Sequence, residues 1–106
     1  MSDKPVVLVV DDDKNTRDGL QRALQRNYTV KTAESAEAAL KILGTEAPVD
    51  VLLTDLRMPG TDGLGLLRRV HGQSPQTVCI LLTAYGSVET AVEAMKQGAY
   101  DFLTKP

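Results

Sequence analysis

The chain has 106 residues, of which 42% are apolar and 25% charged, a composition typical of one small globular domain. Its longest apolar run, residues 5–10, is far shorter than the ~20 residues that a membrane-spanning helix needs. No secretory signal is recognisable, so we expect a cytoplasmic protein without membrane contact. The net charge of −2 offers no basic surface for direct contact with nucleic acid.

The first part of the chain alternates strand and helix patterns. The run at 5–10 is typical of a buried strand, and apolar residues at helical spacing then continue to about Asn27. A strand with a more exposed edge is predicted over 28–32. Ser35 can cap a second helix, for which Gly44 is the stop signal.

The same alternation continues to the end of the chain. A second buried strand is predicted at 51–54, a helix from about Asp62, a strand at 77–82, a helix from Ser87 and a strand at 100–103. The residues expected to face inward from the last two helices are Leu66, Leu67, Val70, Val88, Ala91, Val92 and Met95. Alternation with short loops predicts a doubly wound α/β domain, a parallel sheet with helices on both faces. Five strands and only four helices are predicted, so we expect a domain that lacks its last helix.

Acidic residues follow two of the predicted strands. Asp11, Asp12 and Asp13 come after the first strand, and Asp55 comes after the strand at 51–54. If these strands are neighbours, three or four carboxylates meet at one sheet edge, where they repel one another unless a hard cation lies between them. Any single aspartate here has a simpler alternative as a helix cap or turn residue, and Asp13 fits the N-cap role well.

Taken together, the strand-end residues predict a metal-assisted phosphoryl site. Asp11 and Asp12 would bind Mg²⁺, and Asp55 would supply a third ligand and the nucleophile that forms an acyl phosphate. The turn at 58–60 would aim a backbone carbonyl, that of Arg57, at the metal.

Two further side chains complete this predicted site. Lys105 ends the fifth strand, and its ammonium would neutralise charge on the transferring group. Thr83 ends the fourth strand, and its hydroxyl would donate a hydrogen bond to a phosphoryl oxygen.

These residues resemble a known family over essentially the whole chain, the receiver domains of two-component response regulators. The matching segments are 9–13 (VVDDD), 55–63 (DLRMPGTDG), 82–86 (LTAYG) and 105–106 (KP). The resemblance implies a flavodoxin-like fold with strand order 2-1-3-4-5, so that residues 1–106 form one receiver domain truncated before its last helix. It also implies the same Mg²⁺ ligands, Asp55 as phosphoacceptor, Thr83 as switch hydroxyl and Lys105 as phosphate-binding lysine. Phe102 falls at the family's aromatic switch position.

The segment 82–106 narrows the resemblance to receivers of nitrogen-regulator (NtrC) type activators. Such a domain is not an enzyme in its own right, because it catalyses only its own phosphorylation and dephosphorylation. The implied partners are a histidine kinase, a C-terminal output of AAA+ ATPase and DNA-binding domains, and a second copy in a homodimer. Receivers of helix-turn-helix regulators without an ATPase share much of this segment and remain an alternative.

Two other classes of protein compete with this interpretation. An aspartyl-nucleophile phosphatase would carry its nucleophile after the first strand in an Asp-x-Asp pattern, whereas the candidate here is Asp55, and Arg57 stands where the second aspartate would be. A flavin-binding module of the same strand order would need a hydroxyl- and glycine-rich phosphate loop after the first strand. The aspartates at 11–13 would instead repel a phosphate.

Overall fold

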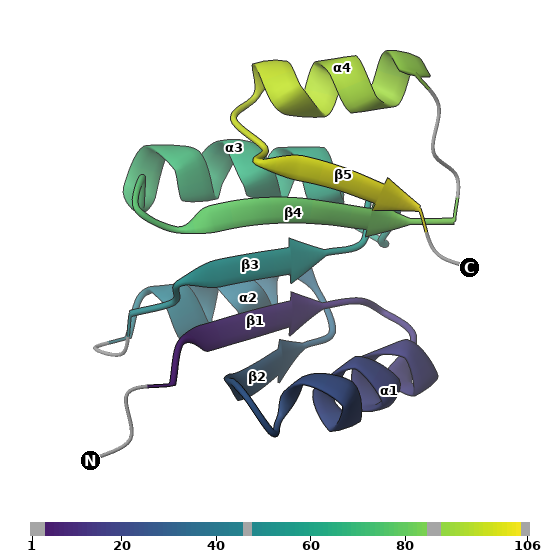
Figure 1. Cartoon of the computed structure of the whole chain (residues 1–106). Coiled ribbons are helices and arrows are strands. Elements are labelled where there is room, and N and C mark those ends of the chain that lie inside the picture. Colours follow the sequence, from purple (N-terminus) through teal and green to yellow (C-terminus); the bar gives the residue numbers. More distant parts are fainter. Residues whose placement is uncertain (1–3, 46–47, 85–87, 105–106) are drawn as a thin grey trace.

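The computed structural model describes residues 4–45, 48–84 and 88–104 as a parallel sheet with helices around it (Figure 1). The sheet order is β2-β1-β3-β4-β5, as the resemblance implied. The strands are β1 (Val6–Val10), β2 (Thr29–Ala33), β3 (Val51–Thr54), β4 (Val78–Thr83) and β5 (Asp101–Thr104). The helices are α1 (Lys14–Leu24), α2 (Ala36–Leu43), α3 (Gly63–Gln73) and α4 (Val88–Lys96).

The helices are distributed unequally over the two faces of the sheet. In Figure 1, α1 lies in front of the sheet at the β2 end, α2 and α3 lie behind it, and α4 lies beyond the β5 edge. Side-chain oxygens cap three of these helices: Asp13 accepts from the Asn15 amide, Ser35 from the Ala38 amide and Asp62 from the Gly65 amide. The predicted caps at Asp13 and Ser35 and the predicted helix start near Asp62 are therefore confirmed.

The register of the sheet sets the position of the acidic residues. β1 lies between β2 and β3, and Val10 pairs with Thr54. The residues that follow this pair, Asp11 and Asp55, therefore leave neighbouring strands at the same edge. The Asp55 amide donates to the Val10 carbonyl (2.9 Å), so the pairing continues to the acidic residue. The strand order reverses between β1 and β3, which is where ligands bind in open α/β sheets.

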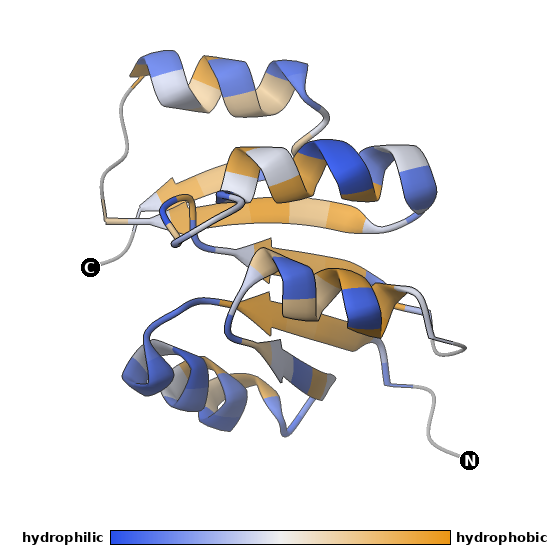
Figure 2. Cartoon of the chain, turned by 180° about the vertical axis from the view of Figure 1, so that it is seen from behind, coloured by the Kyte–Doolittle hydropathy of each residue, from blue (hydrophilic) through white to orange (hydrophobic). Residues whose placement is uncertain are grey.

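The main core lies between the sheet and the pair α2 and α3. Figure 2, the view from behind, shows apolar strands beneath these two helices. The fully buried side chains there include Leu52, Leu81, Leu66, Leu67 and Val70. The inward positions predicted for the third helix are therefore confirmed. Cys79 is also buried on this face, and desolvation raises the pKa of its thiol to about 11, so at neutral pH it packs as a small uncharged side chain.

The opposite face of the sheet is covered less completely. The run at 51–54 was predicted to be buried throughout, but only Leu52 and Thr54 are, whereas Val51 and Leu53 are half-buried. The reason is that α1 covers the β2 and β1 end of this face. An apolar groove of about 290 Å³ remains, and it is lined by Val7, Leu24, Tyr28, Val51, Leu53, Ile80 and Leu103.

The orientation of α4 corrects a sequence-based prediction. Val88, Val92 and Met95 were expected to be buried, but their exposed fractions are 81%, 48% and 48%. The helix instead packs through Ala94, which is fully buried, with Ala91 partly buried beside it. Because α4 lies against the edge strand β5 and not over the centre of the sheet, small residues give it a close contact while its larger apolar residues face outward. The predicted start at Ser87 lies outside the described residues.

None of the helices in the described ranges is both long enough and apolar enough to span a membrane.

Candidate functional site

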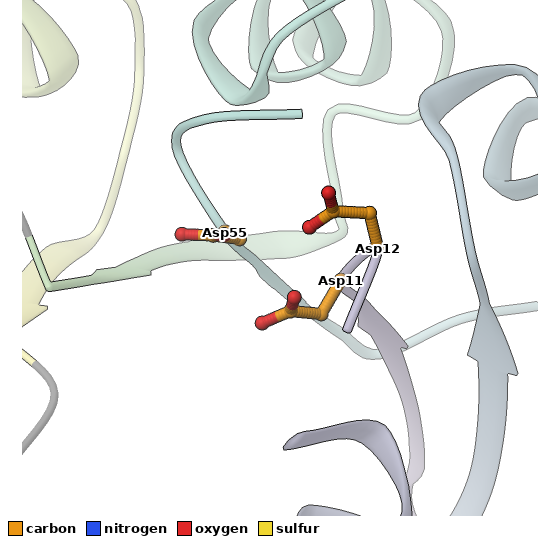
Figure 3. A group of neighbouring side chains, drawn as sticks. All are labelled: Asp11, Asp12 and Asp55. Carbon is orange, nitrogen blue, oxygen red and sulfur yellow. The ribbon is translucent and has the colours of Figure 1, made fainter. Parts of the chain in front are cut away.

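Three of the predicted site residues converge at one edge of the sheet. Asp11 and Asp12 follow β1, Asp55 follows β3, and one carboxylate oxygen of each lies within 4.8 Å of the other two (Figure 3). Asp11 is buried, Asp55 is half-buried and Asp12 is exposed. The cluster is therefore open to solvent on one side and enclosed on the other.

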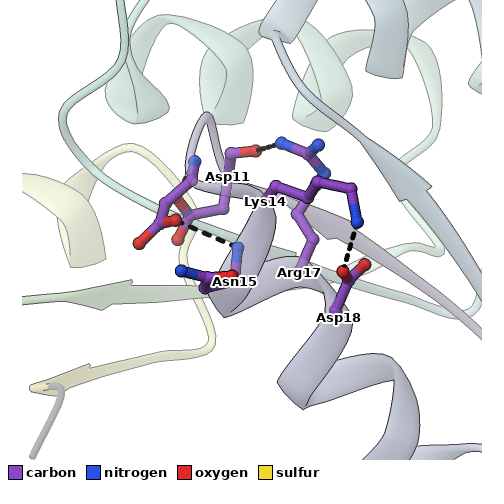
Figure 4. Close-up of polar contacts among 6 residues, drawn as sticks. Asp11, Lys14, Asn15, Arg17 and Asp18 are labelled. Carbon is purple, nitrogen blue, oxygen red and sulfur yellow. Dashed lines mark hydrogen bonds and ion pairs between the residues drawn. The ribbon is translucent and has the colours of Figure 1, made fainter.

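Hydrogen bonds fix the turn that carries Asp11 (Figure 4). The Asp11 amide donates to the Ala33 carbonyl of β2 (3.1 Å), and one oxygen of its carboxylate accepts from the Asp13 amide (2.9 Å). Arg17, on the first turns of α1, donates from Nη1 to the Asp11 backbone carbonyl (2.8 Å). These contacts orient the Asp11 carboxylate toward the edge before any ligand binds.

Asp55 is oriented by its own backbone neighbours. Its Oδ1 accepts from the Leu56 amide (2.9 Å), and its carbonyl accepts from the Thr54 hydroxyl (3.0 Å). The carboxylate is thus held beside the chain as it leaves β3.

A glycine makes the approach of α3 to this segment possible. Gly63 is buried, and its amide donates to the Leu56 carbonyl (2.8 Å). A Cβ at this position would collide with the Asp55 carbonyl oxygen, and it would lie 2.9 Å from the Leu56 Cα. The first turn of α3 therefore packs directly on the backbone of the acidic residue, and no larger side chain fits there.

Thr83 and Phe102 lie on the neighbouring strands. Thr83 is fully buried at the end of β4, where it was predicted. Phe102 is half-buried in β5 and pairs with Leu81, two residues before Thr83 on the same side of β4. Both predicted switch positions therefore belong to the strand pair next to β3.

The remaining predicted features of the site belong to Arg57 and to residues 105–106. Lys105, and the cis Lys105–Pro106 peptide bond that the resemblance implies, fall outside the described residues. Arg57 lies in the loop after Asp55 with an exposed side chain, and its carbonyl remains a predicted ligand.

The donor set fits a small hard cation. Three carboxylates within 4.8 Å of one another offer oxygen ligands alone, and Mg²⁺ prefers oxygen ligands. A soft metal would require sulfur or imidazole, and Asp11, Asp12 and Asp55 supply neither. When bound, such an ion would neutralise charge on a phosphoryl group at Asp55.

The fold and this site together define the class of protein. The family model for the response regulator receiver domain matches residues 7–106, so the chain belongs to that family.

The chain is similar in sequence to NtrC-type regulators. It is 44% identical over 102 residues to the DNA-binding transcriptional regulator NtrC of Escherichia coli, an alignment that covers 95% of this chain and 22% of that protein. The chain thus spans about a fifth of the length of the curated relatives it matches.

Solved structures agree with this family assignment. A response regulator receiver domain protein from Clostridium thermocellum superposes with a TM-score of 0.90 at 33% identity, covering 96% of this chain and 82% of that one. The solution structure of a beryllofluoride-activated NtrC4 receiver domain dimer gives a TM-score of 0.87 at 39% identity, covering 95% of this chain and 84% of that one. The predicted flavodoxin-like receiver fold is therefore confirmed.

Sequence reasoning missed the contribution of Arg17 to the site. Its bond to the Asp11 carbonyl joins residues six positions apart. The one available signal was a basic residue one helical turn after the Asp13 cap, on the side of α1 that faces the strand end.

Proposed function

We propose that this domain is the phosphorylation switch of a two-component regulator that acts in the cytoplasm. The supporting observation is the convergence of Asp11, Asp12 and Asp55, with oxygens within 4.8 Å, at the switch point of the sheet. Asp55 is the proposed phosphoacceptor, since it alone of the three follows β3, the strand that lies between β1 with its two aspartates and β4 with its terminal Thr83.

The proposed reaction is a phosphoryl transfer to a carboxylate. An oxygen of Asp55 attacks phosphorus, the bond from phosphorus to the histidine nitrogen of a kinase breaks, and the histidine leaves with the electron pair and takes up a proton. Asp11, Asp12, Asp55 and the Arg57 carbonyl would hold Mg²⁺, and Lys105 and Thr83 would bind the phosphoryl oxygens. The domain then catalyses only its own phosphorylation and dephosphorylation and is not an enzyme acting on other substrates.

The output of the switch would belong to a longer protein. The relative from Escherichia coli is a DNA-binding transcriptional regulator, and the aligned region covers only 22% of it. We therefore propose that phosphorylation controls an AAA+ ATPase and a DNA-binding domain C-terminal to this one. The receiver itself would not touch DNA, and it would associate with a second copy when phosphorylated.

Phosphate incorporation tests the assignment of Asp55 directly. Incubation with acetyl phosphate and Mg²⁺ should add one phosphoryl group, detected by intact-protein mass spectrometry, and Asp55→Asn should abolish the addition. Asp18→Asn is the matched control, because Asp18 is an exposed carboxylate on α1 that pairs with Lys14 away from the cluster (2.6 Å). Full incorporation in Asp55→Asn would refute the assignment.

A further inference from the structure

A contact between α2 and the loop that follows Asp55 has no part in the proposed chemistry described so far. The Thr61 hydroxyl donates to Oε2 of Glu37 (2.9 Å), across 24 positions of sequence. Glu37 lies in the first turn of α2, and Thr61 lies just before the Asp62 cap of α3. The pair thus ties the loop to a helix that carries none of the predicted ligands.

The Glu37 carboxylate lies directly over the tip of this loop. Gly60 has a φ of +80°, which only glycine adopts without strain, and a Cβ there would lie 3.8 Å from Glu37 Oε1. The hydrogen bond from Thr61 is the largest cause of the lowered pKa of Glu37, and the positive charge of Arg69 on α3 contributes. The carboxylate is therefore ionised and accepts from Thr61 at neutral pH.

The loop between Asp55 and α3 is held at its base and at its tip. At the base, the Leu56 amide donates to Asp55, and the Gly63 amide donates to the Leu56 carbonyl. Toward the tip, the Met58 side chain is buried in the core, and Thr61 reaches Glu37. The predicted metal ligand on this loop, the Arg57 carbonyl, lies between these two sets of contacts.

We infer that Glu37 is a positioning residue for Mg²⁺ binding, acting through Thr61 on the loop that carries the Arg57 carbonyl. This inference rests on the proposed function. Without the hydrogen bond between Thr61 and Glu37, the conformation of the loop that binds the metal would be less populated. The apparent dissociation constant would then rise in inverse proportion to the population of that conformation. A single hydrogen bond at an exposed site corresponds to about a two- to five-fold change.

The test measures Mg²⁺ affinity without any phosphoryl donor. Amide NMR titration with MgCl₂ should give a dissociation constant about two- to five-fold higher for Thr61→Val and for Glu37→Ala than for the unchanged chain. Thr61→Ser keeps the hydroxyl and should restore the affinity. The double variant Glu37→Ala/Thr61→Val should bind Mg²⁺ no more weakly than either single variant, because both substitutions remove the same hydrogen bond.

Thr45→Val is the matched control, since Thr45 also loses an exposed hydroxyl hydrogen bond, to the Ile42 carbonyl at the far end of α2 (2.6 Å). Unchanged Mg²⁺ affinity in both Thr61→Val and Glu37→Ala would overturn the inference. A lower melting temperature of these variants with unchanged Mg²⁺ affinity would overturn it as well, because the contact would then only stabilise the fold. If the unchanged chain bound no Mg²⁺ and accepted no phosphate, the proposed function itself would fail. The two failures are therefore distinguishable.

Discussion

At the scale of single residues, the acidic cluster combines side chains with different structural roles. Asp11 is buried and accepts from the Asp13 amide, and Asp13 caps α1. Asp12 is exposed, and its carboxylate adds negative charge beside Asp11 and Asp55. Experiments on single variants can therefore test which aspartates of this loop are structural and which would bind the proposed metal.

Removal of Asp12 should not destabilise the metal-free domain. Asp12→Ala relieves repulsion within the cluster, so we expect a melting temperature without metal that is unchanged or raised, and a loss of the stabilisation that Mg²⁺ provides. Asp13→Ala removes the same charge one residue later but also the cap, and it should cost about 1 kcal/mol. Differential scanning calorimetry with and without MgCl₂ measures both effects. A clear loss of metal-free stability in Asp12→Ala would mean that this carboxylate is structural.

At the scale of elements, β4 and β5 form the side of the site where the predicted switch lies. Thr83 is fully buried, whereas Phe102 is half-buried and packs against the core. Phenylalanine has no hydroxyl, so its part in a switch has to be a change of packing. A phosphoryl group at Asp55 would draw the Thr83 hydroxyl toward it and vacate space that the Phe102 ring can enter.

This switch should be visible on activation with beryllofluoride, a phosphoryl mimic. We expect the side-chain resonances of Thr83 and Phe102 to shift in the unchanged chain. In Thr83→Val, which keeps the shape but not the hydroxyl, the shift at Phe102 should be largely lost. Thr77→Val is a suitable comparison, because Thr77 is a buried threonine near the opposite end of β4 whose hydroxyl donates to the Val49 carbonyl. Identical positions of Thr83 and Phe102 in both states would contradict the mechanism.

The elements also show how far the sequence determines this structure. The strands themselves followed from the apolar runs, whereas their order followed only from the resemblance to receiver domains. Once β1 and β3 are neighbours, Asp11 and Asp55 have to meet, since parallel strands present their ends at one edge. The orientation of α4 did not follow, because Val88, Val92 and Met95 have the spacing of a buried stripe. Periodicity shows that a helix has two faces, but it cannot show that small residues pack against an edge strand while larger ones stay exposed.

Contacts between residues far apart in the sequence could not be predicted from the sequence either. No sequence motif links Glu37 with Thr61. Their hydrogen bond exists because the fold brings α2 next to the loop after β3. The half-buried state of Val51 and Leu53 likewise depends on how much of one sheet face α1 covers. These features are properties of the assembled fold.

At the scale of the whole molecule, two apolar surfaces are open to a partner. One is the groove of about 290 Å³ over β1, β3, β4 and β5. The other is the outer side of α4 with the start of β5, where Val88, Val92, Met95 and Tyr100 are exposed. Exposed apolar groups that gather in this way are typical of interaction sites.

Phosphorylation should favour a dimer through the α4 surface. In sedimentation velocity runs with beryllofluoride and Mg²⁺, we expect a shift from monomer to dimer that Val92→Lys weakens at least several-fold. Leu103→Lys introduces the same charge in the groove, so a comparison of the two variants shows which of the two surfaces forms the dimer interface. If Leu103→Lys abolished association and Val92→Lys did not, the groove would be the interface.

The close contact at Gly63 has a consequence for the proposed switch. At Gly63, the first turn of α3 lies against the backbone of Asp55 with no side chain between them, so the end of β3 and the start of α3 are closely packed. The Asp62 cap holds the start of α3, and the buried side chains of Leu66 and Leu67 anchor the helix in the core. We therefore expect phosphorylation of Asp55 to move the structure little on this side. We expect the displacement to travel the other way, through Thr83 toward β5 and α4, so that the close packing on one side of the site would give the signal its direction.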